Sequence, residues 1–145
     1  MGAADLPPLA EFMPHRAPML LLDRMLAWSE EAAVCERTVR PGDSFVEEDG
    51  VSALLALELF AQAAAAHVGY LGRTRGDTMG SGALLGTRRI DLAVDRFAPG
   101  DVLEVHVRQL MSIPPLAQYE CALRRRGQTV ASGTVNVAMG AGEAR

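Results

Sequence analysis

The sequence has 145 residues, of which 49% are hydrophobic and 22% charged, a balance typical of one globular domain over residues 1–145. A formal net charge of −4 argues against a nucleic-acid-binding protein, and the absence of lysine excludes Schiff-base chemistry and a phosphate-binding loop lysine. Cys35 and Cys121 show no metal-ligand spacing, so we expect buried free thiols and neither a metal nor another cofactor. The N-terminus has no signal-peptide pattern, which with the free thiols favours a cytoplasmic location.

The first third of the chain predicts irregular structure followed by strands. Residues 5–16 are rich in proline, and residues 19–28 form an apolar run that we expect to begin as a turn and continue as a strand. Residues 32–40 alternate apolar and polar side chains and include β-branched residues, which is a strand pattern. The PGD sequence at 41–43 then predicts a turn.

The most apolar segment is VSALLALELFAQAAAAHVGYLG, residues 51–72. It predicts one long helix that Asp49 caps and that ends at about Tyr70, closed by Gly69 and Gly72. Because this helix is apolar almost all round, most of its sides must be buried.

Three polar side chains interrupt that helix: Glu58, Gln62 and His67. The segment is long enough to span a bilayer, but these residues argue against a membrane helix. A carboxylate in such surroundings needs a partner or a function, because burial of an unpaired charge is costly.

The remainder predicts a loop at 73–82 and then four strands over 83–94, 102–110, 116–126 and 129–139, separated by turns at 98–101, 112–115 and 127–128. One buried helix among antiparallel strands predicts an α+β fold in which a curved antiparallel sheet wraps around one long central helix.

Two motifs resemble the 3-hydroxyacyl-ACP dehydratases of type II fatty-acid synthesis. MPHRAPMLLLDRM, residues 13–25, resembles the PHR-x-P-x-L-x-x-D-R signature of that family, and LELFAQ, residues 57–62, resembles its L-E-x-x-x-Q helix motif. PGD and the strand after it, residues 99–107, also agree in order and spacing, so the resemblance covers about residues 13–138. GALLGTRR, residues 82–89, looks like a subgroup of predicted dehydratases associated with aryl-polyene pigment synthesis.

The resemblance implies a hotdog fold that dimerises, with two active sites at the subunit interface. In that family a histidine before the central helix removes the α-proton of the acyl thioester, and an acidic helix residue protonates the departing hydroxyl. Glu58 matches the acid, and Gln62 shares its helix face and could hydrogen-bond to it. A backbone amide at the helix start holds the thioester oxygen, which points to Ala53 or Leu54.

The chain departs from the family at the general base. The position that aligns with the family's histidine is Ser44, although the following Phe45 matches and is expected to contact substrate. No histidine occurs between His15 and His67. A serine hydroxyl has no useful basicity at neutral pH, so Ser44 could hold a water or the thioester rather than act as a base unassisted.

Other residues could replace the missing base. His15 is the best remaining histidine, and Asp43 could serve in a different geometry. His67 is out of phase with Glu58 on the helix, which favours a core or dimer-contact role. His106 alternates with valines in its strand and is expected to face outward.

Three functions remain open from the sequence. The first is a divergent dehydratase that acts on a 3-hydroxyacyl thioester of ACP or CoA, with Glu58 as acid. The second is a non-catalytic hotdog protein that binds acyl carrier protein or partners an active dehydratase subunit; in such a heterodimer, the shared sites would borrow the partner's histidine. The third is a hotdog thioesterase in which Glu58 activates water. The retained motifs favour the dehydratase as a homodimer or heterodimer.

Overall fold

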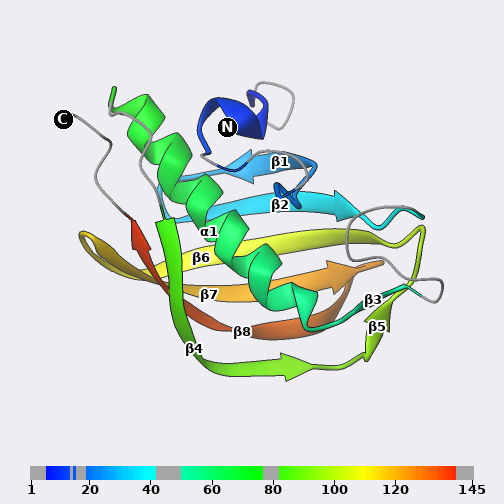
Figure 1. Ribbon diagram of the computed structural model, residues 1–145. Coiled ribbons are helices and arrows are strands. Elements are labelled where there is room, and N and C mark those ends of the chain that lie inside the picture. The colour runs from blue at the N-terminus through cyan, green and yellow to red at the C-terminus, as the bar shows by residue number, and fades with distance from the viewer. Residues whose placement is uncertain (1–5, 14, 16–18, 42–49, 77–81, 140–145) are drawn as a thin grey trace.

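The computed structural model describes residues 6–13, 15, 19–41, 50–76 and 82–139. One helix, α1 (Leu55–Thr74), lies across one face of a six-stranded antiparallel sheet (Figure 1). The strand order in this sheet is β1-β2-β6-β7-β8-β4. The strands are β1 (Arg24–Trp28), β2 (Ala32–Thr38), β4 (Gly82–Leu92), β6 (Val102–Ile113), β7 (Leu116–Arg125) and β8 (Gln128–Met139). The predicted α+β arrangement, one helix wrapped by a curved antiparallel sheet, is confirmed.

The helix begins later than the sequence predicts. Val51–Ser52 forms a short strand, β3, which pairs with β5 (Arg96–Phe97) and so cannot join the helix. Leu54 takes the N-cap position without a side-chain cap, and Asp49 lies outside the described residues. The reason for the difference is tertiary: strand pairing with a distant segment overrides local helix preference.

The helix also ends later than predicted, because Gly69 and Gly72 do not close it and it continues to Thr74. Gly69 has a packing role instead. A Cβ atom at this position would collide with the carbonyl oxygen of Phe12, which follows the short 3-10 helix η2 (Leu9–Glu11). The absence of a side chain at Gly69 therefore lets the N-terminal segment pack directly on α1.

The core lies between α1 and the inner face of the sheet. Alternation in the strands places Leu103, Val105 and Val107 inward on β6, as the sequence predicts. Cys35 and Cys121 are free and buried, which confirms the expected thiols, and burial raises the pKa of each to about 12.

A buried polar group joins the helix to the sheet inside this core. The Nδ1 atom of His67 lies 2.6 Å from the hydroxyl of Tyr119, and its Nε2 atom lies 3.0 Å from the carbonyl oxygen of Ser29. Gln109 donates a hydrogen bond of 3.2 Å to the same hydroxyl. His67 is 0% exposed, which confirms the prediction of a core histidine.

Within the described residues, no helix has the length and apolarity needed to cross a membrane.

Candidate functional site

The candidate site is built on the first turns of α1. The Nε2 atom of Gln62 donates a hydrogen bond of 3.0 Å to Oε2 of Glu58, one helical turn earlier. The predicted contact within the E-x-x-x-Q motif is therefore present. Glu58 itself is exposed in the single chain, whereas the apolar sequence around it predicts a buried carboxylate. Within α1 only Glu58, Arg73 and Thr74 are exposed, so Glu58 lies on a narrow exposed part of an otherwise buried or half-buried helix.

Gln62 is almost completely buried, with 1% exposure, and it fixes the segment that precedes β1. Its Oε1 atom accepts a hydrogen bond of 2.8 Å from the backbone N–H of Leu21, and its Nε2 atom donates one of 2.8 Å to the carbonyl oxygen of Met19. One side chain thus holds both the carboxylate of Glu58 and the backbone of the PHR…DR segment. Because both of its ends are bonded, Gln62 has a defined orientation.

The rim around Glu58 is apolar and open. Met19 is 57% exposed, and Leu54, at 66%, is the most exposed large apolar side chain among the described residues. Met19 is joined to Gln62 through its carbonyl, and Leu54 lies one turn before Glu58 on the helix. The single chain therefore presents an exposed carboxylate close to exposed apolar side chains.

The amides at the helix start are already hydrogen-bonded. The N–H of Ala53 donates to the carbonyl oxygen of Asp95 at 2.9 Å, so it does not point into an open site. The N–H of Leu54 donates to Oγ of Ser52 over a longer 3.3 Å, a contact that a stronger acceptor could replace. Of the two expected oxyanion contacts, only the amide of Leu54 keeps an accessible geometry.

His67 and His106 each have partners of their own, and Glu58 is not among them. His67 is enclosed in the core, and burial lowers its pKa, with the carbonyls of Ser29 and Glu30 opposing this effect. His106 lies on the outer face of the sheet, 3.0 Å from Oε1 of Glu104, as its strand alternation predicts. His15 is partly buried, with its Nδ1 atom enclosed.

Three of the predicted site residues, Asp43, Ser44 and Phe45, lie outside the described residues. Among the described residues there is also no group of three or more histidine, cysteine, aspartate or glutamate side chains that could hold a metal ion.

A model of the ApeP-like proteins, described as ApeP dehydratase, matches residues 7–144. The chain belongs to the ApeP-like dehydratase family. It is also 28% identical over 141 residues to the 3-hydroxyacyl-[acyl-carrier-protein] dehydratase FabZ of Streptococcus agalactiae serotype V, covering 94% of this chain and 98% of that protein.

Among solved structures, this ApeP-like chain is similar to the dehydratase heterocomplex ApeI:P from Xenorhabdus doucetiae, with a TM-score of 0.90 and 26% identity over 93% of this chain and 92% of that chain. A homologue of HP0420 from Helicobacter felis has a TM-score of 0.69 at 12% identity over 94% and 92% of the two chains, and it shares the fold. These similarities confirm the hotdog fold and the dehydratase-like family.

The structure assigns roles in the ApeP-like chain that sequence reasoning missed. Asp23, from the D-R part of the first motif, accepts a hydrogen bond of 2.7 Å from the backbone N–H of Thr38 and two of 3.1 Å from Arg40. Arg37 donates a hydrogen bond of 3.0 Å to the carbonyl oxygen of Leu21. The motif thus fastens the segment beside Gln62 to β2, and its charged residues at fixed spacing were the signal for this role.

Proposed function

We propose that this chain is one subunit of a 3-hydroxyacyl-ACP dehydratase, in which Glu58 is the general acid and a second hotdog subunit supplies the base. The observation that carries the proposal is the Glu58–Gln62 hydrogen bond of 3.0 Å beside an open apolar rim. A positioned carboxylate at an open edge is what a site shared between two subunits requires. The similarity to the FabZ dehydratase and to the ApeI:P dehydratase heterocomplex supports this proposal.

The reaction is an elimination of water. The base removes the proton on the carbon next to the thioester, the C–O bond at the third carbon breaks, and Glu58 gives its proton to the departing hydroxyl. The two electrons of the broken C–H bond form the new double bond, so water and an enoyl thioester leave. Gln62 donates to Oε2 of Glu58, which leaves Oε1 to carry the transferred proton.

The developing negative charge on the thioester oxygen needs a donor. The amide of Leu54 at the start of α1 is suited to this, because the helix N-terminus favours negative charge and the Ser52 contact of 3.3 Å is replaceable. Phe45 and Ser44 remain proposed substrate contacts, and the apolar side chains of Met19 and Leu54 would line the acyl chain.

The test is hydration of a crotonyl thioester, the reverse reaction, with both ACP and CoA as carriers. We expect little activity from the purified chain alone and activity after addition of a histidine-containing hotdog subunit. Glu58→Gln should abolish the activity of the mixture, whereas Glu11→Gln, at an exposed ion pair with Arg73, should leave it unchanged. Activity of the chain alone that His15→Ala abolishes would instead assign the base to His15.

Retention of full activity in Glu58→Gln would refute the proposed acid. Release of free thiol from the acyl thioester, without hydration, would show the thioesterase alternative. If this chain and the histidine-containing hotdog subunit form no complex and show no activity together, the proposed role as a dehydratase subunit is contradicted.

A further inference from the structure

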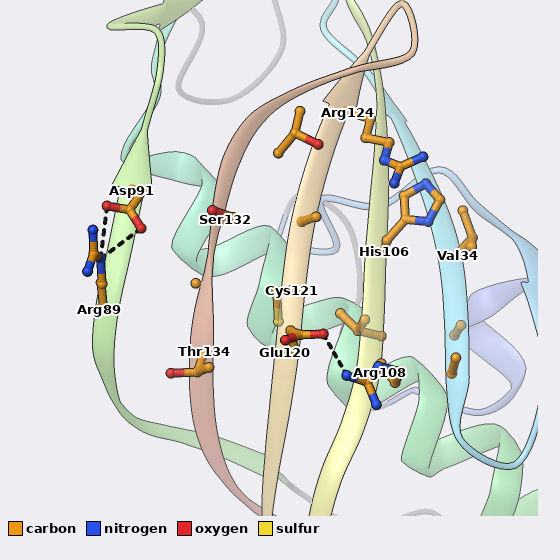
Figure 2. Close-up of a pocket in the computed structure, with 16 residues that line it drawn as sticks. Val34, Arg89, Asp91, His106, Arg108, Glu120, Cys121, Arg124, Ser132 and Thr134 are labelled. Carbon is orange, nitrogen blue, oxygen red and sulfur yellow. Dashed lines mark hydrogen bonds and ion pairs between the residues drawn. The ribbon is translucent and has the colours of Figure 1, made fainter.

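The outer face of the sheet, away from α1, presents side chains in straight rows because neighbouring strands keep a common register. The central row runs from β2 to β4 and consists of Val34, His106, Ala122, Ser132 and Asp91. Figure 2 looks onto this face, with α1 behind the sheet. The row forms part of the lining of a hollow of about 710 Å³.

Charges flank the central row in opposite order on its two sides. On one side, Arg108 of β6 stands opposite Glu120 of β7, and the two side chains form an ion pair of 2.8 Å. On the other side, Glu104 of β6 stands opposite Arg124 of β7. These four residues form a quartet in which each strand carries one positive and one negative side chain around the central row.

We propose that this face binds the same face of a second copy of the chain, related by a two-fold axis through the quartet. If the axis follows the central row, each strand faces itself, so Arg108 meets Glu104 of the second copy and Glu120 meets Arg124 of the second copy. If the axis follows the strands between β6 and β7, Arg108 meets Glu120 of the second copy and Glu104 meets Arg124 of the second copy. The quartet is complementary to itself in both cases.

The packing geometry is compatible with this arrangement. Two sheets pack face to face about 10 Å apart, with their strand directions within about 30° of each other. If the two-fold axis is inclined to the strands, or to the central row, by half that angle, the charges of the quartet still lie opposite charges of the other sign in the second copy. The centre of the face is recessed because the side chains of Ala122 and Ser132 are small. At the β4 edge, Asp91 is neutralised by Arg89, which donates hydrogen bonds of 2.9 Å and 3.0 Å to its carboxylate.

The charges would decide the partner rather than the strength of binding. Exposed ion pairs add little to the strength of binding, whereas like charges brought together across an interface oppose it strongly. The quartet is neutral, so two copies can meet here although each chain has a net charge of −4.

Sedimentation equilibrium of the purified chain tests the proposal, at low and high salt. Glu120→Arg places like charges together under either axis. We expect the mass of the assembly to fall by half and self-association through this face to weaken by roughly tenfold or more. An assembly through the β4 edge would survive this change. Glu11→Arg, which breaks an exposed pair with Arg73 away from this face, is the matched control and should leave the mass unchanged.

Two double variants show which axis is used. Glu120→Arg with Arg124→Glu restores complementarity only for an axis along the central row. Glu120→Arg with Arg108→Glu restores it only for an axis along the strands. Restoration of the mass by one of the two supports the proposal, and restoration by neither refutes it, as does an unchanged mass in Glu120→Arg. Circular dichroism verifies that each variant is folded.

Cross-linking gives an independent reading. Ala122→Cys places a thiol beside the axis in both arrangements, so a short bismaleimide should link two copies. Cys35 and Cys121 are buried, with a pKa of about 12 each, and should not react in the folded chain. Glu11→Cys is the control. Equal yields of cross-linked product from the two variants would contradict the proposed interface.

Discussion

The side chain of Gln62 donates a hydrogen bond to Glu58 and also to the carbonyl oxygen of Met19, at 3.0 Å and 2.8 Å. The position of the proposed acid therefore depends on the segment that precedes β1, far away in the sequence. This relationship gives a physical reason for two motifs that the sequence shows only as separate patterns. One motif supplies Glu58 and the Gln62 side chain that donates to it. The other motif supplies the carbonyl oxygen of Met19, to which Gln62 also donates.

Replacement of Gln62 by leucine should destabilise the fold. The change leaves the N–H of Leu21 without its acceptor in a buried position, and a buried group of this kind costs about 1–3 kcal/mol. We expect a comparable decrease in the free energy of unfolding in urea. Gln118→Leu, which removes an amide pair of 3.1 Å with Asn136, is the control and should change stability by less than about 0.5 kcal/mol. Equal losses in the two variants would argue against the anchoring role of Gln62.

The same residue predicts an effect on activity. In the mixture with a histidine-containing subunit, Gln62→Glu keeps an acceptor for the Leu21 amide but places a second carboxyl beside Glu58. We expect kcat to decrease more than KM changes, because the orientation of the acid is lost while the binding surface remains. A rise in KM with unchanged kcat would instead indicate a role in substrate binding.

Stability should fall in mild acid through His67. Burial lowers the pKa of His67 below its ordinary 6.5, so below that pH the unfolded chain binds a proton that the folded chain does not. The stabilising effect of the neutral imidazole is fully present above pH 6.5 and is lost as the pH falls towards the lowered folded-state pKa. In this range the free energy of unfolding decreases by up to about 1.4 kcal/mol per pH unit.

Urea unfolding at pH 7.5 and pH 5.5 measures this effect. His67→Phe should be less stable at neutral pH, because the Tyr119 hydroxyl keeps only its contact with Gln109 and the carbonyl oxygen of Ser29 loses its donor. Its stability should nevertheless depend less on pH than that of the unaltered chain. His106→Phe, at a partly exposed histidine, should keep the pH dependence. An identical pH dependence in His67→Phe and the unaltered chain would exclude His67 as the source.

Replacement of Gly69 by alanine should loosen the N-terminal segment. The added Cβ would collide with the carbonyl oxygen of Phe12, and overpacking of this kind costs about 1–3 kcal/mol, more than the helix gains from alanine. We expect faster proteolysis before residue 13 and a lower free energy of unfolding. Arg73→Ala removes an exposed ion pair of 2.8 Å with Glu11 in the same contact and should have little effect. A variant with unaltered proteolysis and stability would show that the segment moves aside without cost.

The strands were predictable from the sequence because alternation of apolar and polar residues follows directly from a sheet with one buried face. The pattern in β6 and β7 gave both the strands and the outward position of His106. The helix limits were less predictable. The helix starts late because Val51 pairs with Phe97 in β3–β5, and the glycine at position 69 is needed for contact with Phe12 rather than for ending the helix. Such constraints come from segments distant in sequence and leave no local pattern.

The candidate site was predictable in part. The spacing of Glu58 and Gln62 gave their contact, because residues four apart on a helix are neighbours. The exposure of Glu58 could not be read from the sequence, since a helix apolar on all sides does not indicate which side the sheet leaves uncovered. The bonded amide of Ala53 depends on Asp95, which only the β3–β5 contact brings near.

The pairing of β2 with β6 has a consequence for the order of folding. β6, β7 and β8 follow one another and pair as neighbours, so they can form early from local contacts. β1 and β2 precede the helix and join the sheet only through β6, which is made after α1 and β4. During synthesis the most apolar segment of the chain therefore leaves the ribosome before the sheet that covers it exists, and it is in this interval that the chain is most exposed to aggregation and to chaperones.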